Sequence, residues 1–190
     1  TLLTAVIGTT FAYFTANFTV SNNDAVNSVK TKKLASTNIV IGDAINSTTA
    51  YPGFKGAQSL TIKGAGEAGD VSAKAKITVT PSIPSAFNSD VTWRLIEVGT
   101  DVNVACTSAV KSEAGATGVQ YHDEASCTGI PASETVILSS ATKSTETIDV
   151  AYNTNKKYYL IVEYANNGDQ AGQQGQTFSV KVSAEQVANS

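Results

Sequence analysis

The stretch VSAKAKITVT, residues Val71–Thr80, alternates strictly between apolar and polar side chains. Successive residues of an extended chain point to opposite faces of a sheet. One face of this stretch is therefore apolar and carries Val71, Ala73, Ala75, Ile77 and Val79. The other face carries serine, lysine and threonine. The stretch is predicted to be a strand with one side on a hydrophobic core and the other side in water.

The same two-residue period recurs along the chain. In TFSVKVSA the apolar positions are Phe178, Val180, Val182 and Ala184. Shorter segments of strand-like composition are Lys32–Ile41, Ser59–Lys63, Val91–Val98, Asp101–Cys106, Glu134–Ser139, Glu146–Ala151 and Lys157–Tyr164. Glycine, proline and asparagine clusters separate them, as expected for turns. The chain is therefore predicted to be all-β, with an N-terminal segment (residues 1–20) before a single jelly-roll-like β-sandwich (residues 21–190).

Composition and charge exclude one class of function. The chain has 190 residues, a formal net charge of −3 and only 15% charged residues, and Arg94 is its single arginine. So few cations cannot neutralise a run of phosphates, which excludes a nucleic-acid binder. Uncharged polar residues must instead provide solubility, and that mixture favours strands and turns over surface helices.

Cys106 and Cys127 are the two cysteines, and neither belongs to a CxxC motif. In a cytosolic protein they would be free thiols, whereas in a secreted domain rich in serine and threonine a disulfide is expected. A zinc site would need more ligands than the sequence offers nearby. We predict a structural disulfide that closes a loop over Lys111–Ser126, a stretch with little strand pattern.

Catalytic chemistry has little support in the sequence. The one histidine, His122, lies beside Asp123 and Glu124 in the predicted loop, where a polar surface role is expected rather than a catalytic triad. No HExxH, GxSxG, phosphate-binding or dinucleotide-binding motif occurs, and the carboxylates lack the spacing of a calcium loop. We predict no catalytic residue, no cofactor and no metal site, and hence no enzyme.

Aromatic residues gather in KKYYLIVEY, where Tyr158, Leu160, Val162 and Tyr164 share one face. Two interpretations are open for this face and for the lone Trp93. The side chains could belong to core strands, or they could form an exposed platform for a sugar. We expect the core interpretation.

The first fourteen residues, TLLTAVIGTTFAYF, are strongly apolar. They are too few for the roughly 20 residues of a transmembrane helix, so no membrane span is predicted. The start at Thr1 indicates a processed or truncated chain. Both faces of an extended segment would be mostly apolar, as in a strand covered on both sides, although a helix remains an alternative. One face carries Leu3, Ala5, Ile7, Thr9, Phe11 and Tyr13.

If this strand inserts into the sheet of the next copy, main-chain hydrogen bonds join the copies and the contact repeats without closing. We therefore predict that the six side chains of that face form a subunit interface in a head-to-tail homopolymer. Asn17 and Asn46 lie in N-x-[ST] sequons and are candidate glycosylation sites where the source organism modifies secreted proteins in this way.

Three longer stretches have a pattern of their own. They are GTTFAYFTANFTVSNN, YPGFKGAQSLTIKGAGEAGDVSAKAKITV and YYLIVEYANNGDQAGQQGQTFSVKVSAEQ. These stretches resemble the TasA/camelysin-type secreted proteins. The resemblance implies a jelly-roll domain, secretion, and assembly into biofilm-matrix fibres or pilus-like filaments by donor-strand exchange. The apolar residues before AYF and the two cysteines depart from the pattern of that family.

Together these observations predict a structural subunit of an extracellular filament on the cell surface, with further copies of itself as partners. The alternative is a monomeric secreted adhesion or carbohydrate-binding module, in which Trp93 and the aromatic residues of Tyr158–Tyr164 would be exposed on one face.

Overall fold

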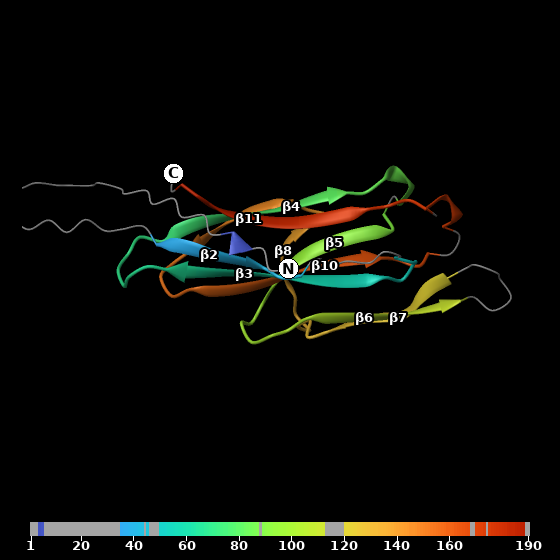
Figure 1. The fold of residues 1–190 in the computed structure, drawn as a ribbon, viewed down its shortest axis with the longest axis horizontal. Coiled ribbons are helices and arrows are strands. Elements are labelled where there is room, and N and C mark those ends of the chain that lie inside the picture. The colour runs from blue at the N-terminus through green and yellow to red at the C-terminus, as the bar shows by residue number, and fades with distance from the viewer. Residues whose placement is uncertain are drawn as a thin grey trace, which may run out of the picture.

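A computed structural model of the chain describes residues 4–5, 35–43, 45, 50–87, 89–112, 120–167, 170–173 and 175–188. The predicted all-β class is confirmed, because two antiparallel sheets pack face to face as a sandwich (Figure 1). The helical segments of the described residues are two short 3-10 turns, η1 (Ser85–Phe87) and η2 (Ala171–Gln173). None of the helices in this part of the chain is long and apolar enough to cross a bilayer.

The larger sheet has six strands in the order β1-β2-β3-β10-β5-β8. Their bounds are Thr4–Ala5 (β1), Ser36–Ile41 (β2), Lys55–Ala65 (β3), Asn155–Tyr164 (β10), Val91–Val98 (β5) and Thr135–Ser139 (β8). The smaller sheet has the order β11-β4-β9, with bounds Ser179–Val187 (β11), Ala73–Ser82 (β4) and Thr145–Val150 (β9). A separate hairpin joins β6 (Ala105–Ser112) to β7 (Gln120–Thr128).

Strand β4 has the alternation that its sequence predicts. Ala73, Ala75, Ile77 and Val79 are buried, and the polar residues between them are not. Val71 is an exception, because its side chain is 43% exposed and the strand begins only at Ala73. The main chain of Val71 instead accepts a hydrogen bond from the N–H of a residue just before β2. The prediction of a core position for Val71 was therefore wrong.

The predicted core role of the aromatic strand is confirmed. Tyr158, Leu160, Val162 and Tyr164 lie in the core between the two sheets, as does Trp93 of β5. They are at most 5% exposed, so they form no surface platform. The structure adds that β10 is covered on its other face as well, where two of its residues, Tyr159 and Ile161, lie in a second cluster under the β6–β7 hairpin. Burial on both faces explains the unbroken apolar run YYLIV.

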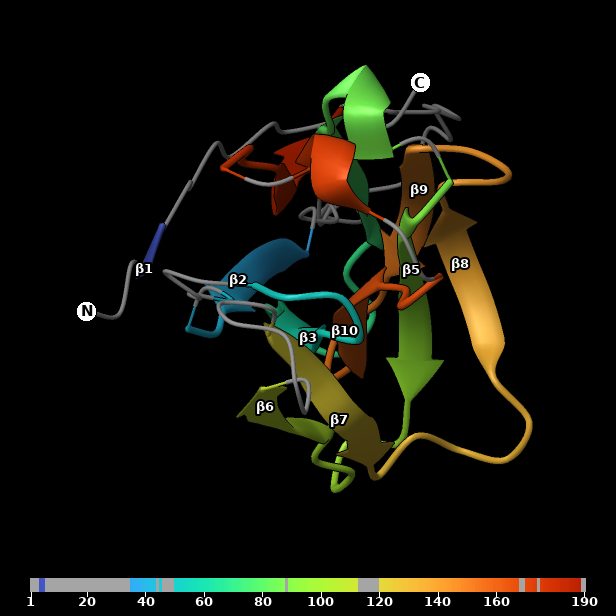
Figure 2. The ribbon, with the colours of Figure 1, turned by 90° about the vertical axis from the view of Figure 1, so that its right-hand side faces the viewer.

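The β6–β7 hairpin forms a third layer on the outer face of the larger sheet (Figures 1 and 2). The predicted disulfide is present, since Cys106 and Cys127 are directly opposite in the ladder and bonded to each other. The expectation of little strand structure between them was wrong, because β7 runs from Gln120 to Thr128. The polar residues of this thin hairpin show no clear alternation, since only part of one side packs on the sheet. Cys127 itself packs against the second cluster.

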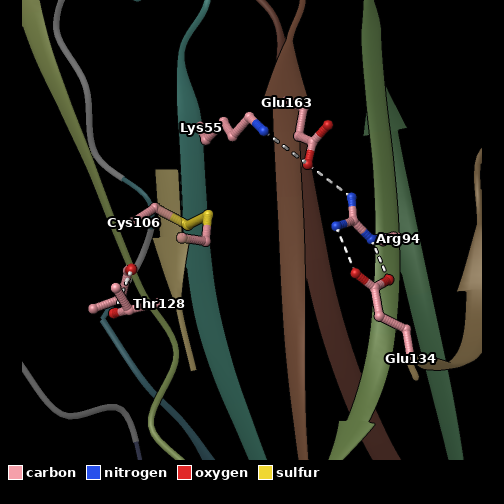
Figure 3. The surroundings of a disulfide bond; sticks show 8 residues. Lys55, Arg94, Cys106, Thr128, Glu134 and Glu163 are labelled. Atoms are coloured by element: carbon pink, nitrogen blue, oxygen red, sulfur yellow. Dashed lines mark hydrogen bonds and ion pairs between the residues drawn. A yellow bond between two sulfur atoms is a disulfide. The ribbon is translucent and has the colours of Figure 1, made fainter. Parts of the chain in front are cut away.

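An ion-pair ladder crosses the same outer face beside the disulfide (Figure 3). Glu163 of β10 contacts Lys55 of β3 at 3.8 Å and Arg94 of β5 at 2.9 Å. Arg94 also contacts Glu134, just before β8, at 2.7 Å. The hydrogen bonds that the Arg94 guanidinium donates to the carboxylates of Glu134 and Glu163 raise its pKa despite its partial burial. The ladder therefore links three neighbouring strands, β3, β10 and β5, to the residue just before β8 at the surface of the sheet.

Removing the disulfide tests how much the third layer contributes to stability. The Cys106→Ser/Cys127→Ser variant is expected to lose about 3 kcal/mol of unfolding free energy, because the unfolded chain regains the freedom of the closed loop. Urea denaturation measures this loss, and reduction of the wild-type protein should reproduce it. Equal stability of the oxidised wild type and the variant would contradict this role.

Two core tyrosines provide a matched test of polar burial. Within the part of the chain that the structure describes, the Tyr158 hydroxyl is the buried side-chain polar atom without a hydrogen-bond partner, and burial raises its pKa. Tyr164 donates to Gln173 Oε1 at 2.6 Å. Tyr158→Phe should therefore keep or slightly increase the unfolding free energy, whereas Tyr164→Phe should lower it by about 1–3 kcal/mol. Chemical denaturation compares them, and equal destabilisation would contradict the difference.

Candidate functional site at the edge of β2

The structure places only part of the predicted subunit interface. Ala5 lies in β1, which pairs antiparallel with β2, so that Thr4 is opposite Val40 and Ala5 is opposite Ile39. Both strands belong to the same chain, so this pairing is intramolecular. The other predicted interface residues lie outside the described residues, namely Leu3, Ile7, Thr9, Phe11 and Tyr13. The two sequon asparagines, Asn17 and Asn46, also lie outside them.

Main-chain hydrogen bonds of β2 alternate between its two sides. The N–H of Gly42 donates to Ser59 of the β3 strand at 2.8 Å, so even-numbered residues bond to β3. Odd-numbered residues therefore direct their N–H and C=O groups to the other side, which is the edge of the sheet. On that side β1 pairs with β2 at Ile39. The edge-facing groups of Ile39 and Ile41 are thus the ones that an added strand can bond.

The other end of this edge is already occupied. Thr37 donates its N–H to Gln186 Oε1 of β11 at 2.9 Å, and its hydroxyl donates to the same oxygen at 3.0 Å. Two residues earlier, the N–H of Ala35 donates to the main chain of Val71 at 2.8 Å. These bonds join the two sheets where β2 approaches β11. We call the space between the neighbouring edges of β2 and β11 the seam. The bonds of Thr37 to Gln186 bridge this seam at one end. The part from Ile39 onward is called its open part.

Partly buried apolar side chains lie in and next to both β2 and β11. Ile41 and Ile45 belong to β2 and the segment after it, while Phe178 and Val180 lie at the start of β11. All pack against the main core without being fully covered. Phe178 also makes edge-to-face contacts with two buried rings, at centroid distances of 5.1 and 5.9 Å. An added strand here would cover apolar surface as well as satisfy main-chain groups.

The other sheet edges differ in ways that disfavour strand addition. β8 has only five residues, with an irregular register against β5. β9 carries Glu146 and Asp149, and β11 carries Lys181 and Glu185. Short, bulged or charged edges resist pairing with another chain. The sequence of β2, STNIVI, has no charge and no proline, so the part of its outer side that β1 leaves unpaired lacks such protection.

A second polar cluster surrounds Asp90, just before β5. Its carboxylate accepts amide hydrogen bonds from Gln173 at 2.6 Å, Asn167 at 2.7 Å and Gln170 at 2.9 Å. These bonds, chiefly that from Gln173, lower the pKa of Asp90. Both carboxylate oxygens accept hydrogen bonds from these amides. The arrangement ties the β10–β11 connection to the start of β5 and has a structural role.

A hollow of about 660 Å³ lies between the β4–β5 connection and the turn that joins β8 to β9. Trp93 and Pro84 contribute to its lining together with several serines. Its one titratable lining residue, Lys143, is paired with Glu146. In the part of the chain that the structure describes, no three histidine, cysteine or acidic side chains gather as metal ligands would.

Sequence reasoning identified the apolar N-terminal segment but not the strand that pairs with it. The signal was present in the uncharged run STNIVI, which has the composition of a strand without a protected edge. Whether that run lies at an edge or in the middle of a sheet depends on strand order, which the sequence does not reveal. Gln186 was missed for the same reason, since its partner Thr37 is 149 positions away.

The Asp90 cluster predicts a dependence of stability on pH. Because the folded-state pKa of Asp90 is lowered, its contribution is present above the unfolded value of about 3.9 and is lost as pH falls through the folded value. Asp90→Asn should therefore lower Tm at pH 7, and the difference from wild type should shrink below about pH 4. Thermal unfolding followed across this range measures it. A difference that stays constant down to the acid limit would contradict the role of the charge.

Comparison with known proteins adds no relative. No protein-family model matches the chain, and no curated protein matches it. The resemblance to TasA/camelysin-type proteins therefore remains a prediction from short motifs, and the case for a function rests on the edge of β2 and on the segment that pairs with it.

Proposed function

We propose that this protein is the structural subunit of an extracellular filament, in which the N-terminal segment of one copy adds as a strand to the β2 edge of the next. The observation that carries the proposal is the pairing of Thr4 and Ala5 with Val40 and Ile39 at an uncharged edge. In the single chain this pairing is intramolecular. Exchange of the same segment between copies makes the same main-chain bonds and is a low-cost route to assembly.

The register of β1 gives this joint a definite geometry. Ala5 is opposite Ile39, so a strand that continues the pairing brings Leu3 opposite Ile41. Ile39 is buried in the core between the sheets, and Ile41 packs against that core. The predicted interface face, which includes Leu3 and Ala5, is thus in register with the core-facing residues of β2. An apolar donor face opposite the core-facing residues of the acceptor supports strand addition.

Strand order supports a jelly roll that lacks its first strand. In a jelly roll, one sheet contains the second, seventh, fourth and fifth strands, and the other contains the first, eighth, third and sixth. The orders β3-β10-β5-β8 and β11-β4-β9 correspond to seven of these eight places. Strands β1 and β2 lie outside this correspondence, next to β3 in the larger sheet. The proposed joint forms there, at the outer side of β2.

Assembly of this kind does not close on itself. The donor segment and the acceptor seam are different surfaces, so each added copy presents a fresh edge and the chain of copies grows. A disulfide-stapled sandwich suits such a filament outside the cell, because disulfides persist in oxidising compartments. Buried aromatic residues leave the alternative of a sugar-binding platform without the side chains on which it depended.

Deleting the donor segment tests the proposal. A variant that lacks residues 1–14 keeps β2 to β11 and should remain a folded monomer that forms no filaments by electron microscopy. Because it keeps the acceptor edge, it should also shorten filaments when mixed with full-length protein, since each truncated copy ends a growing chain. A full-length variant carrying Glu67→Ala, an exposed residue of the loop between β3 and β4, is the control and should still assemble. Filaments of normal length from the truncated protein would refute donor-strand assembly.

A further inference from the structure

We infer that Gln186 is an end stop for strand addition at β2, an inference that rests on the proposed function. Its Oε1 atom accepts both the N–H and the hydroxyl of Thr37, at 2.9 and 3.0 Å. Thr37 is 9% exposed, and a main-chain N–H that is so well buried must have a partner. The Gln186 amide oxygen therefore takes the place that a carbonyl of an added strand would take at this position.

The bond between Gln186 and Thr37 coexists with strand pairing two residues away. In the same structure, Ala5 is paired opposite Ile39 while Gln186 holds Thr37. Pairing at Ile39 therefore does not require Gln186 to leave. This favours a permanent stop over a temporary cap that the incoming strand displaces.

The stop limits where an added strand can bond. In the register of β1, the residue opposite Thr37 is Ile7, and the N–H that it would need is engaged by Gln186. Beyond it, the N–H of Ala35 is engaged by Val71. The joint is therefore held by the edge-facing groups of Ile39 and Ile41, and the donor strand leaves the edge of β2 before it reaches Thr37. Gln186 therefore acts as a positioning residue, because it limits how many residues of the donor strand can pair with β2.

Disulfide trapping between separate copies measures that length. Even-numbered residues of β2 are opposite even-numbered donor residues in the non-hydrogen-bonded pairs, where Cα atoms are close enough for a disulfide. Chains with Thr4→Cys are mixed before assembly with chains carrying Val40→Cys, and chains with Val6→Cys with chains carrying Asn38→Cys. Each chain then has one added thiol, so every cross-link forms between copies. The native cysteines are already bonded to each other.

The first pair should cross-link efficiently and the second weakly. In the Gln186→Ala background, the yield of the second pair should rise about fivefold, as expected when one net hydrogen-bonding position becomes available. Gln186→Glu keeps an acceptor oxygen and should restore the low yield, and Glu185→Ala, an exposed neighbour, should leave it unchanged. Gln186→Ser, which is too short to reach Thr37, repeats the test if the alanine variant folds poorly. Circular dichroism confirms folding of each variant.

The outcomes separate the two proposals. Absence of cross-links for the first pair would overturn strand addition between copies in this register, and with it the proposed function. Cross-links of equal yield for both pairs in the wild-type background, or no change for the second pair on loss of Gln186, would overturn the end stop and leave strand addition intact.

Discussion

An edge strand carries main-chain N–H and C=O groups that must find partners, and in this protein that requirement decides what β2 does. The main-chain N–H and C=O groups of its even-numbered residues bond to β3, and those of its odd-numbered residues face the seam with β11. The protein meets the requirement in two ways. At Thr37 a side-chain amide from the opposite sheet supplies the partner, and at Ile39 a piece of added strand does so. The proposed assembly requires that a strand from another copy can pair with β2 at Ile39.

The other sheet edges carry features that hinder strand pairing. Carboxylates and lysines along β9 and β11, and a short irregular β8, discourage pairing. A protein that polymerises through one edge needs the others to be unattractive, because uncontrolled pairing would give aggregates instead of a filament. The contrast between STNIVI and these strands is therefore part of the argument for a specific joint, and the composition of each edge is as informative as its position.

The central strand of the larger sheet, β10, is held firmly in place. β10 is paired on both sides and covered on both faces, by the smaller sheet on one and by the disulfide-linked hairpin on the other. Outside the hairpin, the ladder of Lys55, Glu163, Arg94 and Glu134 ties its neighbours together at the surface. Exposed ion pairs contribute little energy each, but bidentate contacts between Arg94 and Glu134 align the strands. In the proposed assembly, the acceptor edge belongs to a sheet whose central strand is held on both faces in this way.

The sequence by itself determined the local features that depend on side-chain period and composition. These include the half-buried strands β4 and β11, the core role of Tyr158 and Trp93, the pairing of the two cysteines and the apolar character of the N-terminal segment. Only the tertiary structure decided the order of strands, the third layer that makes β7 a strand and buries Tyr159, and the bond from Gln186 to Thr37. The physical reason is that period and composition act between neighbours in the chain, whereas an edge, a covering layer and a bond across 149 positions exist only after distant segments have packed together.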